Sequence, residues 1–313
     1  MKPQRLGVAA CVVSALGFGA MAIFAKEAYG AGVDVLTLLS CRFLLAALVF
    51  WAIVVARGTR LPSRRVLLSG LALGAGGYAA ESGIFFASLS RIGASLAELL
   101  LYIYPMLVLV GAVLLGRERI TGRRAGALGL ASGGTALVLA GNSLGSVDGL
   151  GVLLAVGAAV LYAGYVLAAD RLVTTVDPLV IAATVTTGAA VSVLAAGGAT
   201  GGLDLSFAPI GWLWIAALAV FSSVVGITGF LVGVRLVGPG TASILSTAEP
   251  VVTVSLAAAV YGEVLSNDAL LGGIVVLAAV VLLQSGGSTV ADDEPAPLAA
   301  RPAPARALAH QPA

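Results

Sequence analysis

The sequence of 313 residues contains little charge, since only 10% of its residues are Asp, Glu, Lys or Arg, whereas an average soluble domain has about 25%. It has one histidine, His310, near the C-terminal end, and two cysteines, Cys11 and Cys41, both inside apolar runs. The scarcity of histidine excludes most histidine-based catalysis. Neither cysteine has a second ligand at metal-binding spacing, so we expect no disulfide, no metal and no other cofactor.

Hydrophobic residues make up 59% of the chain, and its mean hydropathy is +1.07. They form runs of about 20 residues, long enough for a helix to cross a hydrocarbon layer of about 30 Å. The runs lack the alternation of a barrel strand, which leaves helices as the spanning element. We predict an all-α membrane protein with ten transmembrane helices, near residues 6–25, 35–56, 66–89, 95–115, 123–141, 149–169, 178–199, 209–233, 240–261 and 268–286.

The basic residues between these spans are distributed unequally. With the N-terminus in the cytoplasm, the cytoplasmic segments carry 14 Lys and Arg residues, and the outer segments carry only Lys26 and Arg91. Positive charge favours the cytoplasmic side. The pattern predicts a multi-pass protein of the cytoplasmic membrane with both termini inside the cell.

Residues 94–118 are similar to residues 239–263, 145 positions later. A proline lies within each copy, Pro105 or Pro250, and a glutamate follows it after thirteen residues, Glu118 or Glu263. Five helices per copy is an odd number, so the two copies must enter the membrane from opposite sides. Such inverted repeats are typical of alternating-access transporters.

The chain divides accordingly into three parts. We predict a first five-helix repeat at 1–145, a second at 146–286, and a tail at 287–313. The tail is rich in Ala and Pro and has little to bury. We expect it to be disordered and cytoplasmic.

Four charged residues lie inside the predicted spans: Arg42, Glu81, Glu98 and Glu249. A charge in the membrane is costly, so each should face the interior of the bundle. One interpretation is that Arg42 pairs with Glu81 or Glu98 and holds helices together. The other is that Glu249, alone or with Glu81, contacts a substrate ammonium group or carries a coupling proton.

Helical spacing places further polar and aromatic residues on common faces with these charges. Glu98 and Tyr102 share one face, and Ser246 and Glu249 share the equivalent face in the second copy. These faces could also be ordinary packing, but a buried tyrosine hydroxyl needs a partner. The candidate cavity residues are Ser14, Phe18, Glu81, Glu98, Tyr102, Tyr162, Tyr165, Ser246 and Glu249.

The two prolines should interrupt their helices, because proline removes a backbone hydrogen bond. We predict hinges at Pro105 and Pro250, with a fixed kink as the alternative. Glu118 and Glu263 close their segments on opposite sides of the membrane. We assign these two glutamates, together with Arg42, to gates or anchors.

The two copies, ASLAELLLYIYPMLVLVGAVLLGRE and PGTASILSTAEPVVTVSLAAAVYGE, together with Cys41-Arg42-Phe43, resemble the drug/metabolite transporter superfamily, specifically its EamA-type ten-helix exporters. The resemblance implies a secondary transporter that exports a small polar metabolite, such as an amino acid, or a drug-like compound by alternating access. Glu98 and Glu249 depart from the small or apolar residues expected there, and Val185 replaces the arginine in the second repeat. These departures indicate a charged or zwitterionic substrate and an asymmetric site.

A lipid flippase or scramblase of the same fold is the alternative function. We do not expect an enzyme, because the spans contain no His/Glu metal cluster, paired Asp or Gly-x-Ser-x-Gly site. The expected partners are a small-molecule substrate and the lipid bilayer, with protons as one candidate coupling ion and no nucleic acid. Glycine clusters such as Gly126, Gly129 and Gly133 leave both a monomer and a dimer open.

Overall fold

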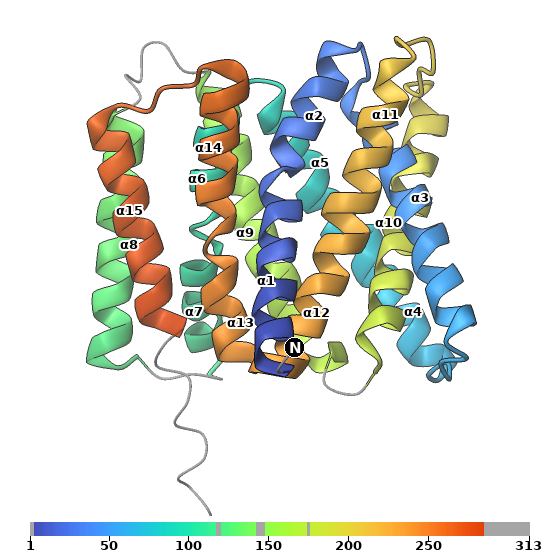
Figure 1. The fold of residues 1–313 in the computed structure, drawn as a ribbon, viewed down its shortest axis with the longest axis horizontal. Coiled ribbons are helices and arrows are strands. Elements are labelled where there is room, and N and C mark those ends of the chain that lie inside the picture. The colour runs from blue at the N-terminus through green and yellow to red at the C-terminus, as the bar shows by residue number, and fades with distance from the viewer. Residues whose placement is uncertain (1–2, 117–119, 142–147, 174–175, 285–313) are drawn as a thin grey trace, which may run out of the picture.

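The computed structural model describes residues 3–116, 120–141, 148–173 and 176–284, and in these residues the chain is a bundle of roughly parallel helices (Figure 1). No strand occurs in this part of the chain. The predicted all-α fold is confirmed. We call the edge of the bundle where α1 begins the N-terminal edge and the opposite edge the far edge.

The helices of the first repeat correspond to the first five predicted spans. They are α1 (Pro3–Gly19) and α2 (Met21–Gly30), α3 (Val35–Ala56), α4 (Arg64–Ala72) with η1 (Leu73–Tyr78) and α5 (Ala79–Leu89), α6 (Ala94–Leu101) and α7 (Tyr104–Leu114), and α8 (Gly122–Gly141).

The helices of the second repeat follow the same order. They are α9 (Gly149–Val173), α10 (Pro178–Thr200), α11 (Ile210–Ala217) with η2 (Leu218–Val225) and α12 (Gly226–Val237), α13 (Pro239–Ser246) and α14 (Glu249–Tyr261), and α15 (Asn267–Gln284). Here η denotes a π-helix, in which each backbone hydrogen bond spans five residues instead of the four of an α-helix. Such segments often mark a functional site.

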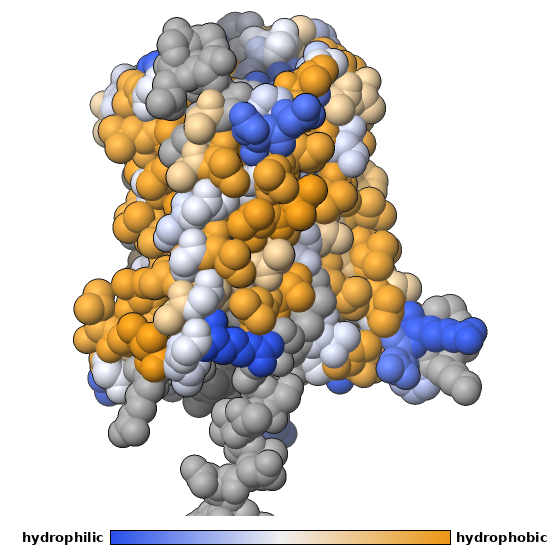
Figure 2. All heavy atoms as spheres, turned by 90° about the vertical axis from the view of Figure 1, so that its left-hand side faces the viewer, coloured by the Kyte–Doolittle hydropathy of each residue, from blue (hydrophilic) through white to orange (hydrophobic). Residues whose placement is uncertain are grey.

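The outer surface of the bundle is suited to lipid. Within the described residues, six helical segments are long and apolar enough to cross a membrane, and shorter apolar helices include Ala125–Val138 and Asn267–Leu282. Leu130 of α8 and Leu271 and Ile274 of α15 are exposed. Figure 2 shows the face that α8 and α15 form, with hydrophobic side chains over most of its height and hydrophilic ones near both ends.

The two repeats run in opposite directions through the bundle. In Figure 1, α1 rises from the N-terminal edge, whereas α9, the first helix of the second repeat, descends from the far edge. The contacts between repeats are reciprocal: α3 packs on its counterpart α10 and α8 on α15, while α1 packs on α12 and α5 on α9. Reciprocal contacts are expected from a two-fold axis in the membrane plane, as in inverted-repeat transporters.

Local features repeat at the spacing found in the sequence. The π-helices begin at Leu73 and Leu218, 145 positions apart, and so do α7 and α14, at Tyr104 and Glu249. Asp34 caps α3 by accepting hydrogen bonds from two backbone N–H groups, and Asp177 caps α10 in the same way through one. The duplication therefore extends to the irregular parts of the backbone.

Candidate substrate-binding cavity

A cavity of about 360 Å³ lies between the two repeats and takes its lining from both. This volume is within the range of small-molecule sites. The structure places eight of the nine predicted cavity residues in its wall: Phe18, Glu81, Glu98, Tyr102, Tyr162, Tyr165, Ser246 and Glu249.

Ser14, the ninth, is not among the cavity-lining residues. Its buried hydroxyl donates a hydrogen bond to the carbonyl oxygen of Gly226, 2.7 Å away. Gly226 and Gly229 lack side chains where α1 crosses, so α12 can approach closely enough for this bond. Ser14 thus anchors α1 to the second repeat and lies behind the cavity wall.

Three carboxylates face the cavity from separate helices. Glu98 of α6 is only 4% exposed, and its Oε2 atom has no hydrogen-bond partner. Glu81 of α5 is 6% exposed and accepts a bond from the hydroxyl of Ser82 at 3.1 Å. Glu249 is the first residue of α14. A buried charge without a partner is unfavourable, so this cluster calls for a proton or a bound cation.

Arg42 also lines the cavity but is 1% exposed, and its Nη1 is a buried donor without a hydrogen-bond partner in the described part of the chain. Its Nε donates to the hydroxyl of Ser223 at 3.0 Å, and its Nη2 contacts the sulfur of Met21 at 3.3 Å. The guanidinium carbon lies 5.3 Å from the ring centre of Phe43 and 5.0 Å from that of Phe86. Cation–π attraction thus stabilises the arginine in place of a carboxylate.

The alternative in which Arg42 pairs with Glu81 or Glu98 differs from this geometry. Among the described residues, the salt bridges are peripheral, and Arg42 takes part in none of them. The physical reason is that the ring of the adjacent Phe43, the ring of Phe86 and the hydroxyl of Ser223 surround its side chain. The arginine is part of the cavity wall, and its assignment to a gate or anchor stays a prediction.

Tyrosine rings form a continuous wall along one side of the cavity. The ring centres of Tyr102 and Tyr104 are 6.0 Å apart, those of Tyr104 and Tyr162 are 4.5 Å apart, and those of Tyr162 and Tyr165 are 5.9 Å apart and stacked. Tyr78 extends the row, 5.7 Å from Tyr165. We call these five residues the tyrosine wall.

Tyr78 and Tyr104 were not predicted as site residues. Tyr104 is two positions after Tyr102, which would point it away in an unbroken helix, and only the interruption after Leu101 turns both rings to the same cavity. Tyr102 donates its hydroxyl proton to the carbonyl oxygen of Ser246 at 2.6 Å. No protein partner occurs for the other four hydroxyls in the described part of the chain, so they are available to a ligand.

Pro105 and Pro250, the predicted hinge residues, each lie directly after a break in the helix of their span. Pro105 is in the first turn of α7 and Pro250 in the first turn of α14, where proline's missing N–H costs nothing. The break before α14 leaves the Ser246 carbonyl to accept the bond from Tyr102. The interruption of both helices is observed, and a hinge motion there stays a prediction.

The far edge is closed by contacts that join the two repeats. Glu263 accepts hydrogen bonds from the backbone N–H groups of Ala94, at 2.9 Å, and Ser95, at 3.1 Å, which are the first residues of α6. Gly262 ends α14 in the left-handed conformation, with φ of 63°, and so turns the chain toward α6. We call this contact the Glu263 cap. Glu118, its counterpart in the first repeat, lies outside the described residues.

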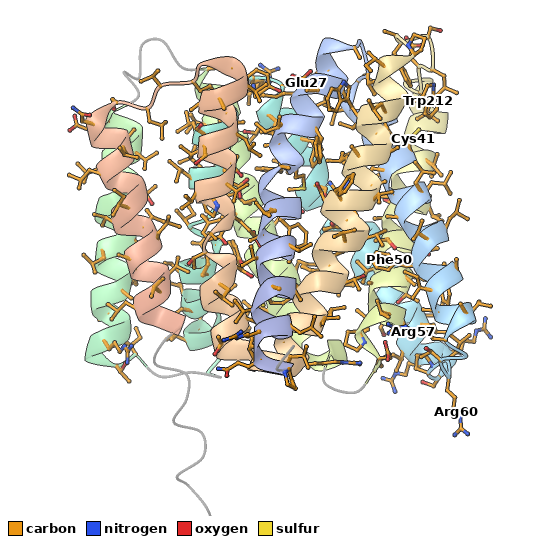
Figure 3. The ribbon with its side chains drawn as sticks, in the orientation of Figure 1. Glu27, Cys41, Phe50, Arg57, Arg60 and Trp212 are labelled. Atoms are coloured by element: carbon orange, nitrogen blue, oxygen red, sulfur yellow. The ribbon has the colours of Figure 1, made fainter. Side chains whose placement is uncertain are left out.

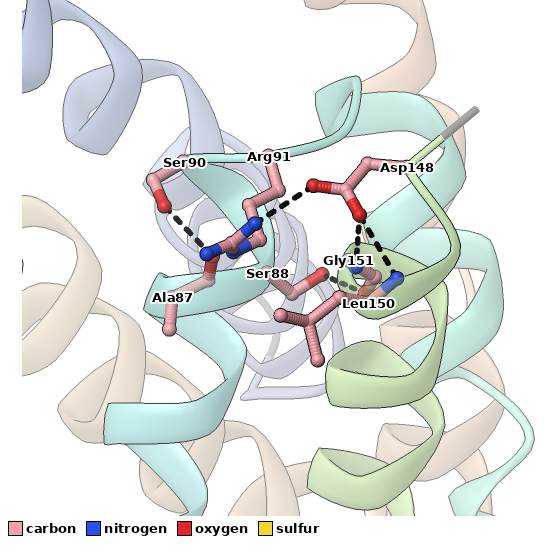
Figure 4. Close-up of polar contacts among 7 residues, drawn as sticks. All are labelled: Ala87, Ser88, Ser90, Arg91, Asp148, Leu150 and Gly151. Atoms are coloured by element: carbon pink, nitrogen blue, oxygen red, sulfur yellow. Dashed lines mark hydrogen bonds and ion pairs between the residues drawn. The ribbon is translucent and has the colours of Figure 1, made fainter. Parts of the chain in front are cut away.

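A second link at the far edge joins Arg91, between α5 and α6, to Asp148, before α9, at 2.9 Å (Figure 4). Asp148 also accepts from the backbone N–H groups of Leu150 and Gly151. The bond from Arg91 and these N–H groups lower the pKa of the Asp148 carboxyl below its usual range. The hydroxyl of Ser88 adds a bond to the Gly151 carbonyl at 2.9 Å.

The cavity itself extends in the other direction. Its lining includes Pro178, the first residue of α10, toward the N-terminal edge, and Leu231, in the middle of α12. Glu98 is in the middle of α6, the helix that begins at the Glu263 cap of the far edge. The structure therefore has a closed far edge and a cavity that reaches toward the N-terminal edge.

Two inverted bundles around a shared, charged cavity define a multi-pass membrane transporter of the drug/metabolite type. The family model of the EamA-like transporter family matches residues 5–140 and again residues 149–285. The chain belongs to this family.

Solved structures share the fold. One, titled "Crystal structure of protein", is 21% identical in sequence, with a TM-score of 0.63 over 88% of this chain and 96% of the other. At that identity the likeness concerns the fold alone. No curated protein matches the sequence.

Proposed function

We propose that this protein is a secondary transporter of the cytoplasmic membrane that exports a small polar metabolite, such as an amino acid, or a drug-like compound by alternating access. The observation that carries the proposal is the cavity between the repeats, with carboxylates from both repeats in its wall. A site at the interface of two inverted repeats can be exposed to either side by rocking one repeat against the other.

The described conformation fits one end state of such a cycle. At the far edge, the Glu263 cap and the bond from the Tyr261 hydroxyl to Glu27, at 2.9 Å, join the repeats. In the opposite state these contacts would separate, and equivalent ones would form at the N-terminal edge. Opening the far edge then requires breaking a few hydrogen bonds, each of which contributes about 1 kcal/mol.

The charge distribution supports an N-terminal edge that faces the cytoplasm. Arg57 and Arg60 lie at that edge, and Glu27 lies near the far edge (Figure 3). Arginine and lysine are retained on the cytoplasmic side of membrane proteins. A cavity that reaches toward the cytoplasm is the form that loads substrate for export.

The charged groups in the lining favour a soluble substrate over a lipid. A flippase of this fold would need a hydrocarbon path for acyl chains beside the headgroup site. The central cavity instead has three carboxylates and a tyrosine wall. We therefore place the lipid flippase second.

The test is uptake and efflux of a compound panel in proteoliposomes, with and without an imposed pH gradient. We expect at least one small polar compound to cross faster with the wild-type protein than with Glu249→Gln or in empty liposomes. A proton-coupled mechanism adds that the pH gradient changes the rate. Equal rates in all three preparations for every soluble compound, together with lipid movement between leaflets, would favour the flippase.

A further inference from the structure

We propose that the transported substrate is an aromatic amine in its cationic form, with its ammonium group held by Glu98 and Glu249 and its ring against the tyrosine wall. The inference deepens the proposed function by naming the chemical class of substrate and rests on it. It depends on the charge balance of the cavity, on the state of Arg42 and on the arrangement of the rings.

The charge balance of the cavity is negative. Three glutamates line it, whereas the described lining residues include only one basic residue, Arg42. Glu98 of α6 and Glu249 of α14 line the same cavity, and these two helices pack against each other. A cation between two such carboxylates removes the repulsion between them and replaces the water that the charges lost on burial.

Glu98 is buried in the cavity wall without a hydrogen-bond partner among the described residues for one of its carboxylate oxygens. It is 4% exposed, it lines the cavity, and its Oε2 atom makes no hydrogen bond. Buried polar atoms without a partner are rare in native proteins, and each calls for a ligand, a water or a proton. An ammonium group offers up to three donors and can serve two carboxylates at once.

Arg42 leaves little of its guanidinium to a substrate carboxylate. Its Nε and Nη2 contact Ser223 and Met21, the rings of Phe43 and Phe86 lie against it, and Nη1 is the one nitrogen of the group without a partner among the described residues. An amino acid would bring a carboxylate into a cavity lined by three glutamates and one arginine. The excess of carboxylates in the lining thus favours the amine over the corresponding amino acid.

The tyrosine wall supplies the second part of the site. Tyr104 and Tyr162 meet edge to face at 4.5 Å, and Tyr162 stacks on Tyr165 with planes 8° apart. Edge-to-face and stacked arrangements present both ring faces and ring edges, which attract a cation and an aromatic ring respectively. The cavity of about 360 Å³ suits a molecule with one or two rings.

The experiment compares three compounds built on one phenylethyl skeleton. Phenethylamine is the cation, L-phenylalanine adds a carboxylate, and 3-phenylpropionate has the carboxylate alone. Binding to the purified full-length protein in detergent is measured by calorimetry. We expect phenethylamine to bind at least tenfold more tightly than either of the others. A smaller preference, or a preference for the amino acid, would overturn the proposal.

Variants then test each part of the site. Glu98→Gln and Glu249→Gln should each weaken phenethylamine binding at least tenfold, because each keeps the shape and removes the charge. Tyr104→Leu should weaken it about three- to thirtyfold, the range of a cation–π contact, while Tyr104→Phe, which keeps the ring, should change it less than threefold. Equal effects of the Leu and Phe variants would show that the aromatic ring of Tyr104 does not contribute to binding.

The matched control for charge is Asp268→Asn, an exposed carboxylate in the first turn of α15, outside the cavity. It should leave binding unchanged, and loss of binding there would contradict a local role for the cavity glutamates. The compound series uses the wild-type protein, so the proposal is tested even where a variant fails to fold.

Failure of this inference can be told apart from failure of the proposed function. If liposomes transport an amino acid and the protein does not bind phenethylamine, the substrate class is wrong and the transporter stands. If phenethylamine binds with the expected dependence on Glu98 but no compound crosses the membrane, the binding site stands and the transport proposal is wrong.

Discussion

The carboxylate of Glu263 in the second repeat accepts a hydrogen bond from the backbone N–H of Ala94 in the first, 2.9 Å away. A side chain of one repeat thus caps the first turn of a helix that belongs to the other. Acidic groups at a helix N-terminus are favourable because the first N–H groups lack partners within the helix. The contact lies at the far edge, which would open in the second half of the proposed transport cycle.

Removal of the Glu263 cap should destabilise the described conformation. Glu263→Ala leaves both N–H groups without their acceptor, and we expect a loss of about 0.5–2 kcal/mol, the usual contribution of a helix cap. Glu263→Gln keeps an oxygen acceptor and should lose less. Thermal unfolding in detergent measures both. An alanine variant as stable as the wild type would show that the cap contributes nothing to this state.

Close approach of α10 to α4 and η1 should make two glycines irreplaceable. A methyl group on Gly74 would overlap the carbonyl oxygen of Val185, and one on Gly188 would overlap that of Leu71. Overpacking against backbone costs about 1–3 kcal/mol or more. We expect Gly74→Ala and Gly188→Ala to lower the melting temperature clearly.

The matched controls for these variants are Gly76→Ala and Gly198→Ala. Neither glycine has an atom within 4 Å of the position that the added methyl carbon would take. Both variants should unfold close to the wild-type temperature. Equal losses in all four would mean that helix flexibility, rather than contact of α10 with α4 and η1, accounts for the effect.

The pair between Arg91 and Asp148 should affect stability in a pH-dependent way. Because the pKa of Asp148 is lowered in the folded protein, its stabilising contribution is complete above the ordinary aspartate pKa of about 3.9 and is lost as the pH falls through the lower folded value. The side chains are 44% and 36% exposed, so salt should screen the pair.

The measurement for this pair is the melting temperature of the wild type and of Asp148→Asn from pH 7 to pH 3, at low and high salt. We expect a small decrease in the variant at pH 7 that shrinks at high salt and disappears at the acidic end. A difference that persists at pH 3 would assign the effect to the backbone cap of α9 rather than to charge.

The cavity carboxylates should determine both transport and its response to a pH gradient. Glu249→Gln and Glu81→Gln each remove a charge from the lining, and a lost charged hydrogen bond of about 1.5–3 kcal/mol corresponds to a tenfold or greater decrease in transport. Proteoliposome assays with and without the gradient measure both effects, with Asp268→Asn as control. If both variants transport normally and respond normally to pH, neither residue binds the substrate or carries the proton.

Much of the fold could be predicted because it depends on local signals. Run length and hydropathy placed a helix at each of the ten predicted spans. The repeat of Pro105 at Pro250 anticipated the two helix breaks, since proline acts on its own neighbourhood. The capping aspartates Asp34 and Asp177 likewise act within one turn.

The parts of the site that were missed depend on contacts distant in sequence or on a change of helical register. Arg42 is enclosed by Ser223, 181 positions later, which no local pattern indicates. Ser14 was placed on the cavity face by helical spacing but faces the carbonyl of Gly226. Tyr104 was overlooked because an unbroken helix would have turned it away from Tyr102.

The central claim is that one cavity is exposed to the two sides of the membrane in turn. A variant with Leu101→Cys, a cavity-lining position, and with Cys11 and Cys41 replaced by alanine is labelled with a membrane-impermeant maleimide from either side. We predict that this variant is labelled from the cytoplasmic side. When Glu263→Ala is added to it and weakens the far edge, we predict additional labelling from outside. Labelling that never occurs from outside, with or without substrate, would contradict alternating access.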